Sequence, residues 1–582
     1  MHESPSLVPS RHEIETAIKT FSKKQWLAFF ASVFVLVVST LILVANLNQR
    51  ILVGIPAHGG AETEGIVGTP RFINPILALS DADKDLTALV YSGLMRKMPD
   101  GEIIPDLASK YEVSADGLTY TFTLKDNIYF QDGTKVTSDD VAYTINQAED
   151  PLIKSPKEVN WDGVEVTVPN PQTVVFTLKQ RFASFLDNTT LGILPAHLWH
   201  DLSPEQFGLS NLNIRPIGSG PFVVSKVNQT SSGIPSSYDL KPFSRFIFGK
   251  PYLDRITLVF YANEKDLISA LENGSVNAIN SISTDQAKLL SKNGYTVKTT
   301  TLPRVFGLYF NQSENKLFTD KNVVTALELA ISKKNIVDTV LNTYGTPISS
   351  PVPPLLLSGD ASSNPTIADN QDLDKAAAIL TKDGWKKNAD GIWEKTDGKG
   401  KKATTTQLSF SISTSDTDEL KQTAQAIQTD LQNFGVHVDL KIFEIGALNQ
   451  TVIRPRKFEA LFFGQVINHD TDLFAFWDSS QRNDPGLNIA MYANAHADKD
   501  LETASGTLDQ AKRTSLYEAF ETEVGNDKPA IFIYSPAFIS VSRNAAKGLD
   551  LERMTSASDR FENVWQWYTE EERVWSIFVP KN

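Results

Sequence analysis

Residues 105–145 read PDLASKYEVSADGLTYTFTLKDNIYFQDGTKVTSDDVAYTI, and their pattern decides the class of fold. Tyr120, Phe122 and Leu124 alternate with threonines, and this period of two predicts a strand with one buried face. The Asp-Gly pairs on either side predict tight turns, because glycine adopts positive φ at little cost. The segment therefore predicts strands joined by short turns, and it contains no pair of residues typical of catalysis.

A helix is expected directly after these strands. Thr137 can cap its N-terminus, with Asp140 at the third helical position. Apolar residues then recur at the spacing of one helix face, at Val141, Ile145 and Ala148. Strands that pass through short turns into a capped helix are typical of a mixed α/β protein.

Residues 418–444 form the clearest α/β unit of the chain. One helix face is marked by apolar residues spaced four and three apart, at Leu420, Ala424, Ile427, Leu431 and Phe434. Gly435 is expected to end that helix, and residues 436–442 then alternate as a strand. Residues 320–341 predict two helices, with Ser332 as a cap for the second. Residues 173–180 and 256–263 predict further strands, and residues 395–406 predict the end of a hairpin.

Length and composition limit the classes of protein to consider. At 582 residues the chain is too long for one core, so two or three domains are expected. A net charge of −14 argues against a nucleic-acid partner, since phosphate binding needs a basic surface. The absence of cysteine excludes disulfides, thiolate metal sites, cysteine nucleophiles and lipid attachment through an N-terminal cysteine.

The N-terminus contains a segment that can cross a bilayer. Residues 26–47 carry no charge and are long enough for one transmembrane helix. Lysines at 19, 23 and 24 precede it, which favours a cytoplasmic N-terminus and places the rest of the chain outside the cytoplasm. A cleaved signal peptide is the alternative, but its apolar region is usually shorter and VANLNQR is a poor cleavage site. An uncleaved anchor is therefore favoured, and the Gly- and Pro-rich residues 51–86 that follow it predict a short tether passing into irregular domain structure.

The sequence offers little chemistry for catalysis or metal binding. His197 and His200 are three apart and could face one metal ion, but the further ligands of a zinc hydrolase are missing, so ordinary histidines at a helix start are favoured. The aspartates of residues 80–85, SDADKD, resemble the start of a calcium loop without its glycine and glutamate, so a solvated or helix-capping run is expected. No phosphate-binding loop, nucleophile elbow or dinucleotide motif is present. We expect no enzyme, no cofactor and no metal.

Residues 89–145 resemble the signature of the extracytoplasmic solute-binding proteins of family 5, the peptide, oligopeptide and nickel receptors of ABC importers. The match begins at LVYSGLMRKMPDGEIIPDLASKYEV and continues through DGLTYTFTL and DDVAYTI. Residues 216–222, PIGSGPF, resemble the family's G-T-G-P-[YF], and further blocks follow in order to about residue 570. The chain departs from the family in its N-terminal apolar segment and in its C-terminal tail, FENVWQWYTEEERVWSIF.

The resemblance implies an α/β fold of the periplasmic-binding-protein-like type II, with two lobes and an inserted third domain after one transmembrane helix. Ligand would be held between the lobes as they close about crossover strands. The implied parts are the cytoplasmic residues 1–25, the anchor 26–47, a discontinuous lobe I of residues 48–88, 215–305 and 535–582, an inserted domain II of residues 89–214, and a lobe III of residues 306–534.

The same resemblance places the ligand site in residues 458–480, FEALFFGQVINHDTDLFAFWDSS. In the peptide receptors an aspartate here pairs with the ligand's α-amino group. In this chain that position falls on Asn468, or on Ile467 with a shift of one, and Asp470 is the nearest acid. The expected ligand-binding residues are Phe463, Gly464, Gln465, Val466, Ile467, Asn468 and Asp470. Because Asn468 carries no charge, we expect the ligand to be gripped chiefly through its backbone or other neutral polar groups.

The sequence therefore predicts a monomeric, membrane-anchored extracytoplasmic receptor. It would bind a peptide or peptide-like solute and deliver it to an ABC permease and its ATPase subunits. A tethered sensor, or a chaperone-like binder of extended chains, is the alternative for the same fold, and an extracytoplasmic hydrolase is a third and weaker hypothesis.

Overall fold

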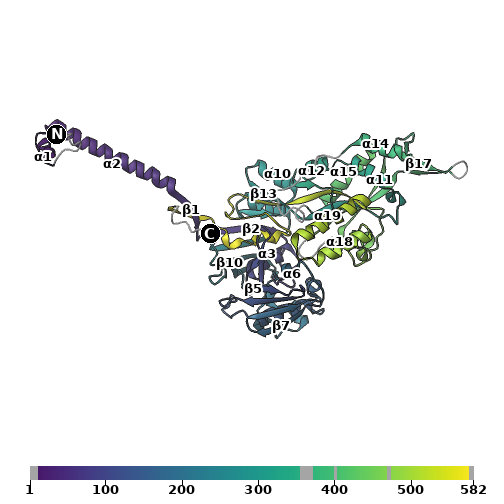
Figure 1. The fold of residues 1–582 in the computed structure, drawn as a ribbon, viewed down its shortest axis with the longest axis horizontal. Helices are drawn as coiled ribbons and strands as arrows, with labels where there is room; N and C mark the ends of the chain where they lie inside the picture. Colours follow the sequence, from purple (N-terminus) through teal and green to yellow (C-terminus); the bar gives the residue numbers. More distant parts are fainter. Residues whose placement is uncertain (1–10, 354–370, 399–402, 468–472, 576–582) are drawn as a thin grey trace, which may run out of the picture. The chain divides into compact units, whose positions relative to one another are not determined.

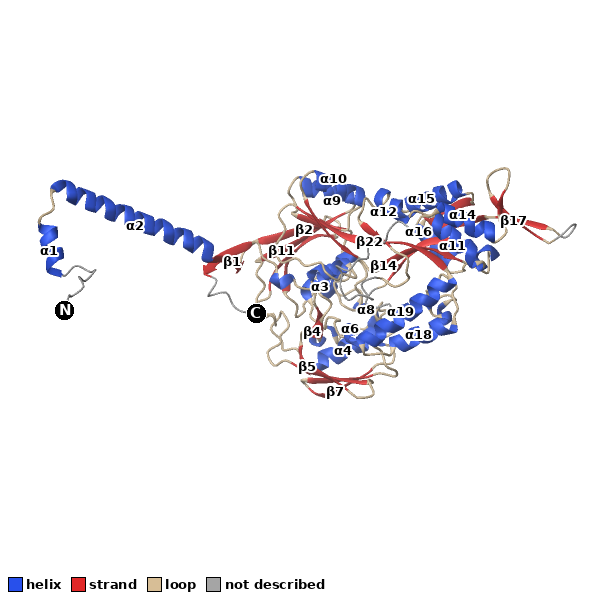
Figure 2. Cartoon of the chain, turned by 45° about the horizontal axis from the view of Figure 1, so that its top comes forward, coloured by secondary structure: helices blue, strands red, loops and turns tan. Residues whose placement is uncertain are grey.

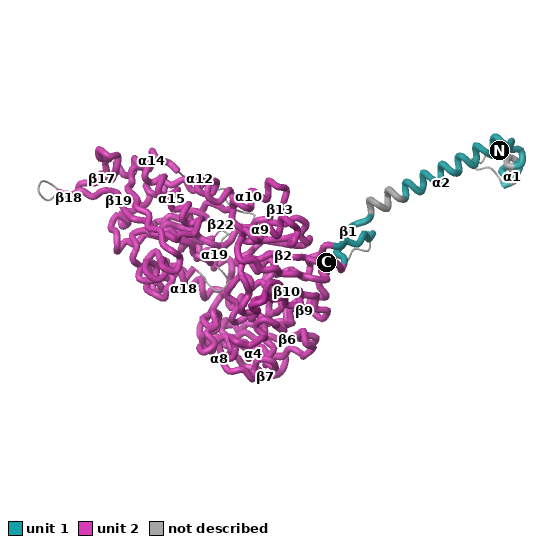
Figure 3. Tube along the Cα trace, turned by 180° about the vertical axis from the view of Figure 1, so that it is seen from behind, with its two compact units in different colours: residues 1–57, 570–582 teal, residues 58–569 magenta. Residues whose placement is uncertain are grey.

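The structure is a computed structural model that describes residues 11–353, 371–398, 403–467 and 473–575. The chain divides into two compact units, which are coloured separately in Figure 3. One unit is Met1–Ala57 with Glu570–Asn582, and the other is His58–Thr569.

The described residues of the first unit form two helices and a two-stranded ribbon. Helix α1 (Arg11–Lys19) is followed by α2 (Lys23–Ile51), and residues 23–44 of α2 are long and apolar enough to cross a membrane. Strand β1 (Leu52–Ala57) follows α2 directly and pairs antiparallel with β23 (Glu570–Trp575), the last element of the described chain (Figure 2).

The short tether predicted at the start of residues 51–86 is wrong, whereas residues 68–80 have the irregular structure expected after it. Residues 52–57 are strand β1, residues 61–67 are strand β2 (Ala61–Val67), and residues 81–90 are helix α3 (Asp81–Val90). Glycine and proline suggested an irregular segment, but a two-stranded ribbon tolerates a proline because each of its strands is an edge. The strand that pairs with β1 lies more than 500 residues further along the chain, so no pattern within residues 52–57 indicates the pairing.

The second unit is built around a twelve-stranded mixed sheet, with the order β20-β19-β21-β14-β22-β12-β2-β11-β10-β9 and with β13 and β15 also pairing with β22 (Figure 1). Its strands other than β2 are β9 (Phe222–Gln229), β10 (Pro235–Pro242), β11 (Arg255–Tyr261), β12 (Ala278–Asn280), β13 (Thr296–Thr301), β14 (Arg304–Phe310), β15 (Gly345–Pro347), β19 (Ser409–Ser415), β20 (His437–Phe443), β21 (Ala460–Val466) and β22 (Ala530–Ser542).

Two connections join the halves of this sheet. Strand β22 pairs with β14 through its first residues and with β13 and β12 through its last. Strands β13 and β14 follow one another with only residues 302 and 303 between them. The predicted ends of lobe I at residues 305 and 535 fall in these crossing strands, and the division into lobes stays a prediction.

The opening stretch folds as its pattern predicts. Strand β6 (Thr119–Leu124) buries alternate residues and lies in a four-stranded sheet with β5 (Ala108–Val113), β8 (Thr173–Thr177) and β7 (Glu165–Asn170). Helix α4 (Ser138–Glu149) follows, and the Asp140 carboxylate accepts the backbone N–H of Thr137 at 2.8 Å. The predicted apolar face of α4 is buried, which confirms the strand-turn-helix prediction.

The other predicted elements are also present. Helix α15 (Asp418–Phe434) ends at Gly435, whose φ of +103° is the left-handed conformation that favours glycine, and β20 follows. Helices α11 (Lys321–Ala330) and α12 (Lys333–Thr339) are separate, and the Ser332 hydroxyl accepts the Asn335 N–H. Strands β17 (Trp393–Asp397) and β18 (Thr404–Gln407) form the predicted hairpin. The mixed α/β prediction is confirmed.

The remaining helices cover the sheets, and α18 and α19 lie side by side (Figure 1). They are α5 (Glu158–Trp161), α6 (Phe185–Asn188), α7 (Ala196–Trp199), α8 (Pro204–Phe207), α9 (Glu264–Glu272), α10 (Thr284–Lys292), α14 (Leu373–Lys382), α16 (Ile445–Leu448), α17 (Leu473–Trp477), α18 (Ala495–Ser505) and α19 (Gln510–Asp527). The short strands are β3 (Met95–Lys97), β4 (Ile103–Pro105) and β16 (Lys386–Lys387).

A buried ionic group fastens the C-terminal part of this unit to its N-terminal part. The Arg560 guanidinium donates to Glu64 at 2.9 Å and to both carboxylate oxygens of Asp85 at 2.8 and 2.7 Å. Neighbouring Glu62 forms no ion pair with a described residue, and burial raises its pKa to about 8. Residues 80–85, SDADKD, begin helix α3, and Asp83 completes a capping box with Ser80. This confirms the helix-capping alternative for the run. Asp85 is not solvated, since it lies in this buried group.

Candidate ligand-binding site

Strand β21 carries most of the predicted site and lies between β14 and β19. It runs antiparallel to β14, with Gly464 opposite Phe306 and Val466 opposite Arg304. Because directly opposed residues of an antiparallel pair project to the same face, these four residues share one face of the sheet. Gly464, Phe306 and Arg304 are half-buried there, and Val466 is 40% exposed.

The other predicted residues of β21 face differently. Gln465 and Ile467 are only 2% and 3% exposed, and Phe463 is half-buried. Gln465 lies opposite Val305, which belongs to the core beneath α18 and α19. Both amide atoms of Gln465 are buried without a hydrogen-bond partner in the described chain. The side chains of Gln465 and Ile467 thus line the interior, so the exposed face holds Gly464 and Val466.

One edge of β21 lacks a neighbouring strand at Gly464. The Ile467 N–H donates to Pro303 O at 3.0 Å, so odd-numbered residues of β21 hydrogen-bond to β14 and Gly464 directs its backbone groups to the opposite side. On that side the pairing with β19 ends at Leu461, and the Thr414 hydroxyl donates to Phe462 O at 2.9 Å. Among the described strands none pairs with Gly464 there. An extended chain can therefore add at this edge.

A glycine is required at position 464 by its aromatic neighbour. A Cβ atom there would lie 2.6 Å from the Phe306 ring. That ring is stacked on Tyr534 with centroids 5.0 Å apart. The Tyr534 hydroxyl donates to Glu419 at 2.8 Å, and burial raises the pKa of this carboxyl group. The face thus presents a fixed aromatic surface next to an unpaired strand edge.

Arg304 is a residue of this face that the sequence analysis missed. Its Nε is buried without a hydrogen-bond partner, and its guanidinium forms no ion pair with any residue that the structure describes. Burial lowers the pKa of Arg304, and the nearby charges of Asp81 and Glu419 oppose that shift. An arginine that begins an otherwise apolar strand, directly after Pro303, was the available signal. Buried charges are normally paired, so an unpaired guanidinium here can receive an anionic group.

Two residues of the predicted site, Asn468 and Asp470, lie outside the described residues. The absence of a carboxylate for the ligand's α-amino group therefore stays a prediction.

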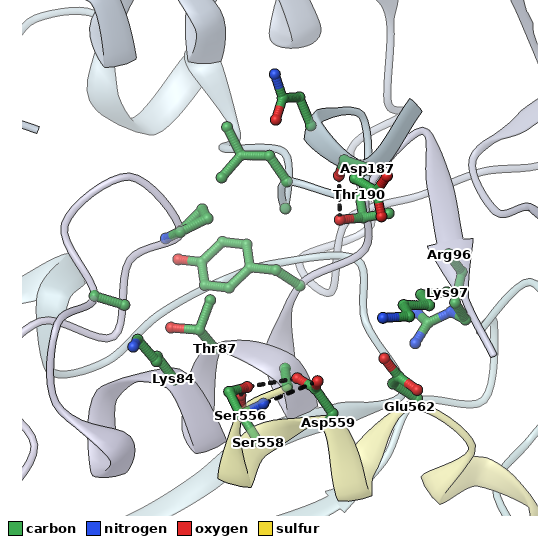
Figure 4. Close-up of a pocket in the computed structure, with 18 of the residues that line it drawn as sticks. Lys84, Thr87, Arg96, Lys97, Asp187, Thr190, Ser556, Ser558, Asp559 and Glu562 are labelled. Atoms are coloured by element: carbon green, nitrogen blue, oxygen red, sulfur yellow. Dashed lines mark hydrogen bonds between the residues drawn. The ribbon is translucent and has the colours of Figure 1, made fainter. Parts of the chain in front are cut away.

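A cavity of about 260 Å³ lies elsewhere, between α3, β3 and the C-terminal helix η6 (Ala557–Phe561). Figure 4 shows Lys84 and Thr87 near Ser556 and Asp559, with Arg96 and Glu562 beyond them. Several of its charged groups are already engaged, because Asp559 accepts the N–H groups of Thr555 and Ser556 and Arg96 donates to Asp106. None of residues 463–467 lines this cavity, so it is separate from the predicted ligand site.

His197 of α7 and His200, which follows the helix as its C-cap, have ordinary contacts. The His197 Nε2 lies 2.7 Å from an Asp132 carboxylate oxygen, and the His200 Nδ1 lies 3.1 Å from Ala196 O. Within the described ranges no three His, Cys, Asp or Glu side chains cluster in a way that could hold a metal ion.

The chain is similar to several characterised binding proteins. It is 28% identical over 503 residues to the oligopeptide-binding protein AppA of Bacillus subtilis, covering 84% of this chain and 89% of that protein. The structure of AppA in complex with a nonapeptide superposes with a TM-score of 0.65 and 26% identity, covering 88% of this chain and 99% of that one. NikZ from Campylobacter jejuni, in complex with Ni(L-His), has a TM-score of 0.67 and 25% identity, covering 87% and 99%.

These similarities confirm the periplasmic-binding-protein-like fold expected from the sequence. The family is one of binding proteins, so the expectation that the chain is not an enzyme is also confirmed. The model of the bacterial extracellular solute-binding proteins, family 5, matches residues 102–486, and the chain belongs to that family.

Proposed function

We propose that the chain is a membrane-anchored receptor that binds a peptide or peptide-like solute and delivers it to an ABC permease and its ATPase subunits. The names of its relatives support this ligand class, because AppA is an oligopeptide-binding protein and was crystallised with a nonapeptide. Helix α2 supports the anchor, since residues 23–44 can cross a membrane by length and composition.

The observation that carries the proposal is the unpaired edge of β21 at Gly464. An extended peptide can add to this edge as a further strand. The main-chain hydrogen bonds that it would form do not depend on side-chain identity. Arg304 lies on the same face and offers a positive charge whose buried Nε has no hydrogen-bond partner among the described residues. A peptide that adds along β21 and directs a carboxylate to Arg304 satisfies both features.

Backbone methylation of the ligand tests the strand addition directly. An oligopeptide that binds the chain beginning near Ile51 is titrated calorimetrically against analogues N-methylated at successive residues. We expect methylation at the position whose N–H donates to Gly464 O to weaken binding about tenfold or more, because the lost N–H leaves that carbonyl unsatisfied. Methylation at the two neighbouring positions is the matched control, since those N–H groups point away from β21. Equal effects at all positions would show that the ligand does not add as a strand.

The anchor is tested by the mature N-terminus. We expect full-length protein in the membrane fraction that retains residues 1–25, and a soluble monomer when the chain begins near Ile51. Recovery of most of the protein as a free species beginning near Asn46 or Leu47 would show a cleaved signal instead.

A further inference from the structure

The two departures of this chain from its family, the N-terminal apolar segment and the C-terminal tail, meet in one structure. Strand β1 begins at Leu52, directly after α2 ends at Ile51. Strand β23 pairs with the whole of β1, from Ala57 opposite Glu570 to Leu52 opposite Trp575. The C-terminal strand therefore runs toward the end of α2 and brings Trp575 beside the helix-to-strand junction.

The height of Trp575 above the bilayer follows from the helix geometry, given the proposed anchor. The uncharged segment ends at Leu47, and α2 continues through Asn48, Gln49 and Arg50 to Ile51. Four residues of helix rise about 6 Å. The interfacial layer on each side of the hydrocarbon core is about 5–8 Å thick. Leu52 and its partner Trp575 would then lie within the headgroup layer.

The distribution of aromatic residues supports this placement. At the N-terminal end of the span, Trp26 is stacked on Phe30 and contacts Phe21 and Phe29, an arrangement typical of a membrane interface. At the other end, no aromatic residue occurs between Phe34 and Phe72. Trp575 is 50% exposed and is the aromatic residue that β23 supplies at that end.

The side chains of β23 change from acidic to basic and apolar along the strand toward α2. Its first three residues are glutamates, at 570, 571 and 572, and they pair with the part of β1 that is furthest from α2. Arg573, Val574 and Trp575 follow toward the helix. Acidic residues thus lie away from a surface of anionic headgroups, and a basic residue and an apolar pair lie near it.

We propose that β23 is a second membrane contact, in which Trp575 enters the lipid headgroup layer beside the end of α2, so that both ends of the chain fix the receptor to the bilayer. This inference rests on the proposed anchor. In this proposal β23 contacts the lipid interface, and the contact requires no other protein.

The pairing is tested with engineered cysteines, for which the cysteine-free chain is a clean background. In the full chain, Val53→Cys with Val574→Cys places the cysteines directly opposite each other, within the Cα separation that a disulfide needs. Val53→Cys with Glu572→Cys is the matched control, because that pair is diagonal and about 7 Å or more apart. We expect a disulfide in the first pair and none in the control. Absence of the first disulfide would overturn the ribbon, and because Val53 lies beyond residues 46 and 47, this result does not depend on whether the anchor is cleaved.

The lipid contact is tested in vesicles of phosphatidylcholine and phosphatidylglycerol that contain only the full chain. A nitrobenzoxadiazole dye is attached to Trp575→Cys, or to Glu570→Cys as the control at the far end of β23. We expect a blue-shifted emission at 575 that is quenched by headgroup spin-labelled lipid, and unshifted, unquenched emission at 570. Emission at 575 that matches the control would overturn the contact. Mass analysis of the same samples reports the N-terminus separately, so that a cleaved anchor is distinguished from a failed lipid contact.

Discussion

Arg304 provides the sharpest prediction about the ligand. Arg304→Met keeps a long apolar side chain on the face shared with Phe306 and Gly464 and removes the guanidinium, whose Nε has no partner within the described chain. A buried polar group without a partner costs about 1–3 kcal/mol, so the ligand-free variant should be more stable than wild type by about that amount. A residue with a merely structural role would give the opposite sign.

The same substitution should weaken a ligand that carries a carboxylate. A hydrogen bond to a charged group contributes about 1.5–3 kcal/mol, which corresponds to about 10- to 100-fold in Kd. The assay compares urea unfolding of the ligand-free chain with calorimetric titration of an oligopeptide and its C-terminal amide. We expect wild type to prefer the free carboxylate and Arg304→Met to lose that preference.

The matched control for Arg304 is Arg454→Met. Arg454 is an exposed arginine that already donates to Asp484 at 2.9 Å, so its removal should leave both the stability and the carboxylate preference unchanged. The reasoning is refuted if Arg304→Met lowers the free energy of unfolding by more than about 1 kcal/mol while the preference for the carboxylate persists.

Three further predictions concern the site and the core. Gly464→Ala should destabilise the protein by about 1–3 kcal/mol in urea unfolding, because its Cβ would lie 2.6 Å from the Phe306 ring; an unchanged midpoint would show that the ring moves freely. Because burial raises the pKa of Glu62 from 4.5 to about 8, the native state holds more protons than the unfolded state in this range, and stability should fall as pH rises through it. Glu62→Gln should flatten that decline, and an equal decline in the variant would assign it to other groups. A capped peptide should bind wild type about as well as its free-amine form; a preference above about tenfold that Asp470→Ala abolishes, with Asn468→Asp titrated alongside, would show that Asp470 holds the amine.

Strands and helices were predictable where their pattern lies within their own residues. Tyr120, Phe122 and Leu124 are all buried in β6, because alternation along a strand directly reports which face meets the core. Helix α15 and its glycine stop followed from the spacing of apolar residues and from the conformational freedom of Gly435. These features need no knowledge of distant partners.

Features that depend on distant partners were not predictable in this way. Residues 52–57 alone predict a tether and not a strand, because the partner of β1, strand β23, lies at the other end of the chain. The face that the Gln465 side chain takes was not predictable, since the register with β14 decides it; that side chain is buried, and contact of Gln465 with the ligand stays a prediction. Arg304 became a candidate only because its Nε is buried without a hydrogen-bond partner among the described residues.

Native mass spectrometry of the chain beginning near Ile51, purified without denaturation, tests the central claim of solute binding most directly. We expect one non-covalently held solute per chain, released on denaturation and exchanged by added oligopeptides without change in their mass. A chain that carries no solute and binds none of the added oligopeptides, or that returns them hydrolysed over many turnovers, would contradict the account.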